Sequence, residues 1–269
     1  MTAVALRLRR LSPKPAGRGD LAIKVLARFL DTVSGLERGQ LSADEARQRL
    51  GRERLLWRGH AWEARMLDAL AGLQADGDDP VAAMATWQTV LSREPDETTA
   101  AGIVGRMRKA LARSLAPDNA DAVDPVTALV LLKTFPLLLP DAEPGRRLVY
   151  GVAARLAEAG LPAQAAGLLD EHHARAGPPA ASGLLELARY QLAADEANAA
   201  RATVSRVDVK GDALAADRRV TEAEALLALG RAGDALRLLE GHSGANVLRL
   251  RARDVATRGL VSPARGALV

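Results

Sequence analysis

The chain of 269 residues contains no cysteine. Disulfides, thiolate metal sites and thiol nucleophiles are therefore excluded. The absence of cysteine also fits a reducing compartment, so we expect a cytoplasmic protein. No stretch reaches the roughly 18 apolar residues that a membrane-spanning helix requires. The arginines near the N-terminus have no apolar run behind them, so they do not form a secretory signal.

Aromatic residues are scarce, at 3% of the chain, whereas Ala, Leu and Arg are abundant. Alanine and straight-chain residues lose little conformational freedom in a helix, while β-branched and aromatic residues favour sheets. The composition therefore predicts an all-α protein, although GC-rich bacterial genomes favour the same residues. Because 48% of the residues are hydrophobic, the chain can bury a substantial core in one elongated domain or two compact ones.

Catalytic and metal-binding patterns are also missing. No phosphate-binding GxxxxGK[ST] loop occurs, and Ser182 lacks the flanking glycines of a hydrolase nucleophile. His172 and His173 are adjacent, so they cannot share one helix face as a zinc-binding pair does. A surface role is the preferred interpretation for the histidines. We expect no enzyme activity, no cofactor, no metal and no small-molecule substrate. The alternative is a helical enzyme domain with an unrecognised site, which a deep closed pocket with convergent polar groups would support.

Positive charge is concentrated at the N-terminus. Residues 1–28 contain seven basic residues and one acid, Asp20, whereas the rest of the chain is close to neutral. A nucleic-acid binder normally carries its charge along the folded surface. We therefore interpret residues 1–18 as a disordered basic arm and disfavour nucleic acids and membranes as partners. The alternative is an adaptor tethered to anionic membrane or nucleic acid through this arm.

Capping signals divide the remaining chain into helices. Ser42 and Glu45 form a capping box, and Asp-Pro pairs beginning at residues 79 and 124 have the pattern of an N-cap followed by a first-turn proline. Pro136 should end or kink the helix that opens at residue 125, because it removes a backbone donor. Other helices are predicted over 20–35, 42–57, 61–75, 98–115, 146–159, 162–175, 181–193, 196–206, 213–229, 232–240 and 245–258.

Parts of the sequence repeat. DPVAAMATWQTVLSREP begins at Asp79, and the similar DPVTALVLLKTFPLLLP begins 45 residues later at Asp124. A glycine followed five residues later by an alanine occurs at Gly160 and again at Gly230, an interval of twice 35. Self-similarity at such periods indicates a stack of helical repeats.

These units resemble the tetratricopeptide repeat (TPR), a 34-residue pair of helices with small residues where the helices cross. The second helix of the family carries Ala, a bulky residue four positions later, a small one at seven and Pro at twelve. Long bacterial repeat proteins of this family look similar, especially around LLWRGHAWEARMLDAL. The matching residues are Ala83, Trp87, Val90, Pro95, Ala128, Leu132 and Pro140, with a large residue at Phe135, and Ala165, Ala199 and Ala235 at later helix crossings.

The resemblance implies a right-handed α-solenoid of antiparallel helix pairs. We expect a basic arm at 1–18, a helical hairpin at 19–59, and repeats over 60–269 as about five pairs plus a partial terminal unit. The C-terminal end is apolar at Leu260, Val261, Leu268 and Val269, whereas a repeat stack needs a polar cap. Either the chain is a piece of a longer solenoid, or this end supports self-association.

The expected function is a scaffold that binds a peptide or protein in the concave groove of the stack. In this family the first helices line the groove. Arg106, Lys109 and Arg147 could grip the carboxylates of an acidic peptide. The Lys/Asn arrangement with which chaperone-binding members hold a C-terminal carboxylate is absent from the matching positions. The predicted groove residues are Arg65, Asp68, Arg106, Lys109, Arg147, Tyr150, Glu158, Gln191 and Glu224.

The three tryptophans lie close together in sequence at Trp57, Trp62 and Trp87. The preferred interpretation is core packing between the first two helix pairs. The alternative is an anchor pocket for a partner side chain, since Trp, Tyr and Arg are frequent in binding hot spots.

Overall fold

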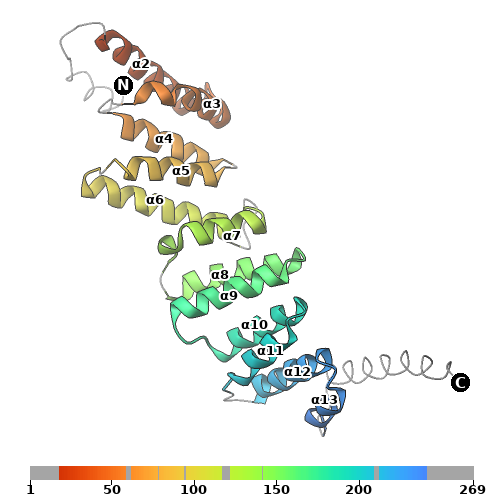
Figure 1. Cartoon of the computed structure of the whole chain (residues 1–269). Helices are drawn as coiled ribbons and strands as arrows, with labels where there is room; N and C mark the ends of the chain where they lie inside the picture. The colour runs from red at the N-terminus through yellow and green to blue at the C-terminus, as the bar shows by residue number, and fades with distance from the viewer. Residues whose placement is uncertain are drawn as a thin grey trace, which may run out of the picture. The chain divides into compact units, whose positions relative to one another are not determined.

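A computed structural model of the chain describes residues 18–240, apart from 59–61, 78, 94, 117–121, 141 and 209–211. Over these residues the protein has twelve α-helices, two short 3₁₀ helices and no strand (Figure 1). The prediction of an all-α protein is therefore confirmed. No helix of the described part combines the length and the apolar character needed to cross a bilayer.

The chain divides into two compact units. In the first unit, α3 packs against α2 and α4, and α4 packs against α5. Ion pairs connect α6 to α4. The helices of this unit are α2 (Arg18–Glu37), α3 (Ala43–Glu53), η1 (Arg54–Trp57), α4 (Glu63–Asp76), α5 (Pro80–Leu91) and α6 (Glu97–Leu115), together with η2 (Pro136–Leu138).

In the second unit, each α-helix packs against the next one in the sequence, and α10 also packs against α12. The helices are α7 (Pro125–Thr134), α8 (Ala142–Glu158), α9 (Pro162–Ala176), α10 (Ala181–Ala193), α11 (Ala197–Ser205), α12 (Asp212–Ala228) and α13 (Ala232–Leu238). Their bounds lie close to those predicted from the sequence, except that α8 begins four residues earlier.

The predicted helix starts are observed. The Ser42 amide donates to the Glu45 carboxylate at 2.8 Å, and the Glu45 amide donates to the Ser42 hydroxyl at 3.2 Å. Asp79 accepts from the Ala82 amide at 2.9 Å, and Asp124 accepts from two amides of α7 at 3.0 Å each. These bonds satisfy donors that have no partner within the helix.

Pro136 also acts as predicted. The helix α7 ends at Thr134, and Pro136 opens the separate 3₁₀ turn η2. Because proline has no backbone N–H and its ring clashes with the preceding turn, α7 cannot continue through this position.

Several helices share a recurring core pattern. A buried alanine is followed four residues later by a larger buried residue, and none of these residues is more than 2% exposed. Small residues let two helices approach closely, and the larger neighbour fills the adjacent space. The pairs are Ala83 and Trp87 in α5, Ala128 and Leu132 in α7, Ala165 and Leu169 in α9, Ala200 and Val204 in α11, and Ala235 and Leu239 at α13.

The prediction that Ala199 lies at a helix crossing is wrong by one residue. Ala199 is only half-buried, whereas Ala200 is fully buried. The turn before α11 explains the shift, since Asp195 has a positive φ of 61°, like Gly160 at 79° and Gly230 at 73°. Counting five residues from each turn leads to a buried alanine. The 70-residue interval is thus two units of 35, with an aspartate at the middle turn.

Two of the three tryptophans are core residues. Trp57 is fully buried and meets Phe29 edge to face, with ring centroids 6.0 Å apart. Trp87 is 2% exposed, while Trp62 is only partly buried. The core interpretation is therefore confirmed for Trp57 and Trp87.

Several predictions fall outside the described residues. They are the basic arm up to residue 17, the helix predicted at 245–258 and the apolar C-terminal end. Arg18, the last residue assigned to the arm, is the first residue of α2.

Candidate functional site

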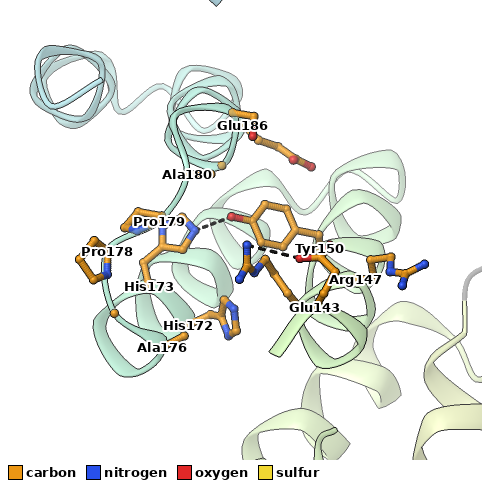
Figure 2. A pocket seen from close by; sticks show the side chains of 14 residues that line it. Glu143, Arg147, Tyr150, His172, His173, Ala176, Pro178, Pro179, Ala180 and Glu186 are labelled. Atoms are coloured by element: carbon orange, nitrogen blue, oxygen red, sulfur yellow. Dashed lines mark hydrogen bonds and ion pairs between the residues drawn. The ribbon is translucent and has the colours of Figure 1, made fainter. Parts of the chain in front are cut away.

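A pocket with a volume of about 230 Å³ lies within the second unit (Figure 2). Its walls come from the first turns of α8, the last turns of α9, the connection between α9 and α10, and the first turns of α10. The residues that line it include Glu143, Arg146, Arg147, Tyr150, His172, His173, Pro178, Pro179, Ala180, Ser182, Gly183 and Glu186.

One hydrogen bond joins the walls of this pocket. The Tyr150 hydroxyl of α8 lies 2.7 Å from Nε2 of His173 on α9, as the dashed line in Figure 2 shows. Both groups lie against Gly183 of α10, where an added Cβ would overlap the Tyr150 hydroxyl. Any other residue at this position would force the Tyr150 side chain to move away from its contact with His173.

Burial controls the ionisation of the pocket's rings. It raises the pKa of the Tyr150 hydroxyl and lowers the pKa values of His172 and His173, because a charged ring loses hydration there. His173 is only 8% exposed, so the preference for a surface role is wrong for this histidine. At neutral pH the pocket therefore contains a neutral phenol and two neutral imidazoles.

The charged groups of the pocket are mostly paired. Arg146 lies 3.4 Å from Glu143, and Glu186 accepts a 2.8 Å hydrogen bond from the Tyr190 hydroxyl. Arg147 is exposed and has no partner among the described residues. In the same part of the chain, no three His, Asp or Glu side chains gather closely enough to hold a metal ion.

A second set of predicted residues lies on α4 and α6 of the first unit. Asp68 accepts two hydrogen bonds from the Arg106 guanidinium, at 3.0 and 2.8 Å, and a third from Nε1 of buried Trp87 at 2.9 Å. The Arg106 guanidinium is therefore already bound by a carboxylate of the same chain. Arg65 and Lys109 are exposed, and neither has a partner among the described residues.

The first unit has a pocket of its own, with a volume of about 300 Å³. It lies between η1, α4 and α5, and its walls include Arg54, Arg58 and Arg93. Arg93 forms an ion pair with the buried carboxylate of Glu63. None of the predicted groove residues lines this pocket.

The remaining predicted residues differ in exposure. Glu158 is exposed and Glu224 is half-buried. Gln191 is buried, and its side-chain oxygen accepts a 2.8 Å hydrogen bond from the Thr203 hydroxyl. Its polar group therefore serves an internal contact between α10 and α11 rather than a solvent-facing groove.

The structure brings only some predicted residues together. Asp68 and Arg106 are in direct contact, and Arg147 and Tyr150 line one pocket. Lys109 belongs to the first unit and Arg147 to the second, so the predicted cationic trio is divided between the units.

Sequence reasoning missed three features of the pocket: the buried imidazole of His173, the contact at Gly183 and the absence of a side-chain cap at the start of α10, a helix whose bounds it predicted correctly. Only the last had a readable signal. The helix follows Pro178-Pro179 with no Ser, Thr, Asp or Asn at the N-cap. The contacts of the other two depend on how three helices pack.

Comparison of the chain with protein-family models, with curated proteins and with solved structures found no match.

Proposed function

We propose that the chain is a TPR-like α-solenoid of antiparallel helix pairs that binds an acidic peptide or protein segment. In this proposal it is a non-enzymatic scaffold that acts in the cytoplasm, and the first helices of the pairs form the binding surface. The supporting observation is the buried alanine with its larger neighbour, which recurs in five successive second helices. A chain that repeats one packing contact in this way is expected to stack its units.

A second observation concerns contacts between first helices. Asp68 and Asp76 of α4 pair with Arg106 and Arg113 of α6, and Arg189 of α10 pairs with Asp217 of α12. Each ion pair connects the first helix of one helix pair with the first helix of the next helix pair. Within each compact unit, the first helices that these pairs join are therefore neighbours, as a surface made of first helices requires.

The cations available for an acidic partner are Arg65 and Lys109 in the first unit. Both are exposed, and no carboxylate of the described residues neutralises them. Arg106 contributes positive charge beside them but is bound to Asp68. We therefore assign the primary contact with the partner to Arg65 and Lys109, with Arg106 in a positioning role.

The test is affinity capture followed by mass spectrometry with the full chain and two charge-reversed variants. Changing Arg65 and Lys109 together to Glu should remove the captured partner. Changing Arg108 to Glu is the matched control, because Arg108 is also an exposed cation of α6 but points in a different direction around the helix. Recovery of the same partners by the Arg65/Lys109 variant would contradict this surface.

A further inference from the structure

The pocket of the first unit carries more positive than negative charge. Arg54, Arg58 and Arg93 line it, whereas Glu63 is the one carboxylate among its described lining residues. In the pocket of the second unit, by contrast, two arginines are matched by two carboxylates. A cavity lined by an excess of one sign of charge attracts ions of the opposite sign. The first-unit pocket therefore favours an anion.

Two of these arginines have no internal carboxylate to neutralise them. Arg54 and Arg58 are exposed, and neither forms a hydrogen bond or ion pair with another described residue. Arg54 is the first residue of η1 and Arg58 follows its last residue, so this one short helix brings both to the same pocket. Neighbouring positive charges repel one another, and a bound anion reverses this repulsion.

The third arginine is held at the pocket by a buried carboxylate. The Glu63 side chain is only 5% exposed and forms an ion pair with the Arg93 guanidinium. A guanidinium has five N–H donors, and the Arg93 side chain is 41% exposed, so donors that Glu63 does not use remain accessible. The carboxylate of the pocket is thus already paired, while the arginine beside it can still donate to a ligand.

A side-chain amide adds further donors. The hydroxyl of Thr86, which is buried, donates to the side-chain oxygen of Gln74 at 2.8 Å. The Nε2 group of Gln74 has no partner among the described residues, and it carries both N–H donors of the amide. Gln74 is only half-buried and lines the pocket. Its amide can therefore donate to a ligand oxygen alongside the arginines.

Part of the pocket wall is apolar. Leu55, Ala82 and Ala85 line it, and Leu55 is 62% exposed. The volume of about 300 Å³ lies at the lower end of the range for small-ligand sites, about 300–1,000 Å³. A small organic group attached to the anion would cover this apolar surface and remove it from water.

We infer that this pocket binds a phosphate monoester. Such a group carries close to two negative charges at neutral pH, which match the two positive charges in excess, whereas a carboxylate carries only one. Its three terminal oxygens accept hydrogen bonds in the forked geometry that guanidinium groups provide. Its organic group lies against Leu55 and the two alanines. The inference is independent of the proposed peptide-binding surface, because none of the predicted groove residues lines this pocket.

The probe for the site is phenyl phosphate, and its matched ligand is phenyl sulfate, which has the same ring and a similar tetrahedral group but a single negative charge. Each is titrated into the full chain at constant ionic strength and about pH 7, above the second phosphate pKa of about 6. The Nε–H signals of Arg54, Arg58 and Arg93 are followed by NMR. They should shift and saturate with phenyl phosphate, and phenyl sulfate should bind about tenfold more weakly or worse. Absence of a saturable shift, or equal binding of the two ligands, would overturn the assignment.

Two double variants separate the pocket from the overall charge of the protein. Arg54→Gln with Arg58→Gln should weaken phenyl phosphate binding about tenfold or more. Arg49→Gln with Arg52→Gln removes two exposed charges of α3 that do not line the pocket, and should bind phenyl phosphate like the unchanged protein. Arg93 is kept, because its loss would leave a buried carboxylate without its partner. Equal affinities of the two double variants would contradict the site.

The carrier of the phosphate is identified with two further ligands. Phosphoserine with both termini blocked is compared with a short peptide that contains the same residue, each in competition with phenyl phosphate. Tighter binding of the peptide assigns the carrier to a phosphorylated protein, whereas equal or weaker binding of the peptide assigns it to a small molecule. Failure of both compounds to displace phenyl phosphate would show that the pocket recognises the ring of the probe, and would overturn the phosphate assignment.

Discussion

The helix pairs α8/α9 and α10/α11 occupy successive 35-residue units, yet they fill one equivalent core position in different ways. In α8/α9 the position holds two buried leucines, Leu156 and Leu168. Thirty-five residues later the same position holds Gln191 and Thr203, which are buried and hydrogen-bonded to each other. The backbone arrangement therefore accepts either an apolar or a polar pair, provided that the polar pair is satisfied.

A hydrogen-bonded pair of glutamine and threonine occurs twice at this position among the described residues. The Thr86 hydroxyl donates to the Gln74 side-chain oxygen at 2.8 Å in α4/α5, with the 12-residue separation that Gln191 and Thr203 also have. Both pairs stand at one repeat position, because Gln74 precedes the buried Ala83 by nine residues, as Gln191 precedes Ala200. Gln191 is buried at this position, whereas Gln74 is only half-buried and also lines the pocket of the first unit.

The largest effect should come from truncating the apolar pair. Leu156→Ala leaves a cavity in a fully buried site and should lower the free energy of unfolding by about 2–5 kcal/mol. Chemical denaturation of the full chain measures the loss. Glu158→Ala, an exposed change in the same helix, is the control and should have little effect. A loss as small as that of the control would show that this position is not packed.

Overpacking tests the register of α11. Ala200→Leu adds three carbons at a fully buried helix crossing and should cost about 1–3 kcal/mol of unfolding free energy. Ala199→Leu places the same residue one position earlier, where the side chain is half-buried, and should cost less. The reverse order of the two variants in denaturant midpoint would restore the register predicted from the sequence.

The polar pair can be broken and then converted into its apolar counterpart. Gln191→Ala leaves the Thr203 hydroxyl buried without its partner and should cost about 1–3 kcal/mol. Replacing both residues by leucine copies Leu156 and Leu168, and should return the unfolding free energy close to that of the unchanged protein. If the double variant is less stable than Gln191→Ala, the two positions are not equivalent.

The loss of stability at acid pH should differ between the helix pairs α8/α9 and α10/α11. Burial lowers the pKa of His173 below its usual 6.5, so the folded state prefers the neutral ring. The unfolded chain then takes up the proton first as the pH falls. This contribution to stability is complete above about pH 6.5 and is lost as the pH falls through the folded pKa. The protection of amides from hydrogen exchange, relative to their intrinsic rates at each pH, should therefore fall at low pH in α8/α9 more than in α10/α11, and replacing His172 and His173 together by Gln should remove this difference.

The smallest effect concerns the turns. Asp195 has the positive φ that glycine adopts at Gly160 and Gly230. Asp195→Gly should raise the unfolding free energy by up to about 1 kcal/mol, because glycine has no Cβ to strain in this conformation. Gly160→Asp is the reciprocal change and should lower it. A loss of stability in Asp195→Gly would mean that the aspartate makes a contact worth more than the strain.

Much of the fold could be predicted from the sequence because its signals are local. The capping box at Ser42, the two Asp-Pro helix starts and the break at Pro136 each act within one turn of the chain. The repeat at Ala83 and Ala128 was visible because its neighbours are also similar.

The wrong predictions concern residues whose register or side-chain contacts are set by a turn or by a neighbouring helix. Ala199 was chosen over Ala200 because two adjacent alanines cannot be told apart without the turn, and an aspartate hid that turn. Gln191 is predicted as a groove residue from the family resemblance alone, whereas its side chain is buried against Thr203 of another helix. In the pocket, His173 and Gly183 depend on the close approach of three helices, which no local pattern encodes.

The central claim is that the helix pairs stack in sequence order, and distances between equivalent positions test it most directly. Asp76, Glu158 and Ala228 are exposed and each is the last residue of a first helix, in α4, α8 and α12. Because the chain has no cysteine, each pair of these positions can be changed to cysteine and spin-labelled without background. Stacking predicts that the 76–228 distance exceeds both the 76–158 and the 158–228 distance. A 76–228 distance shorter than either of the others would contradict it.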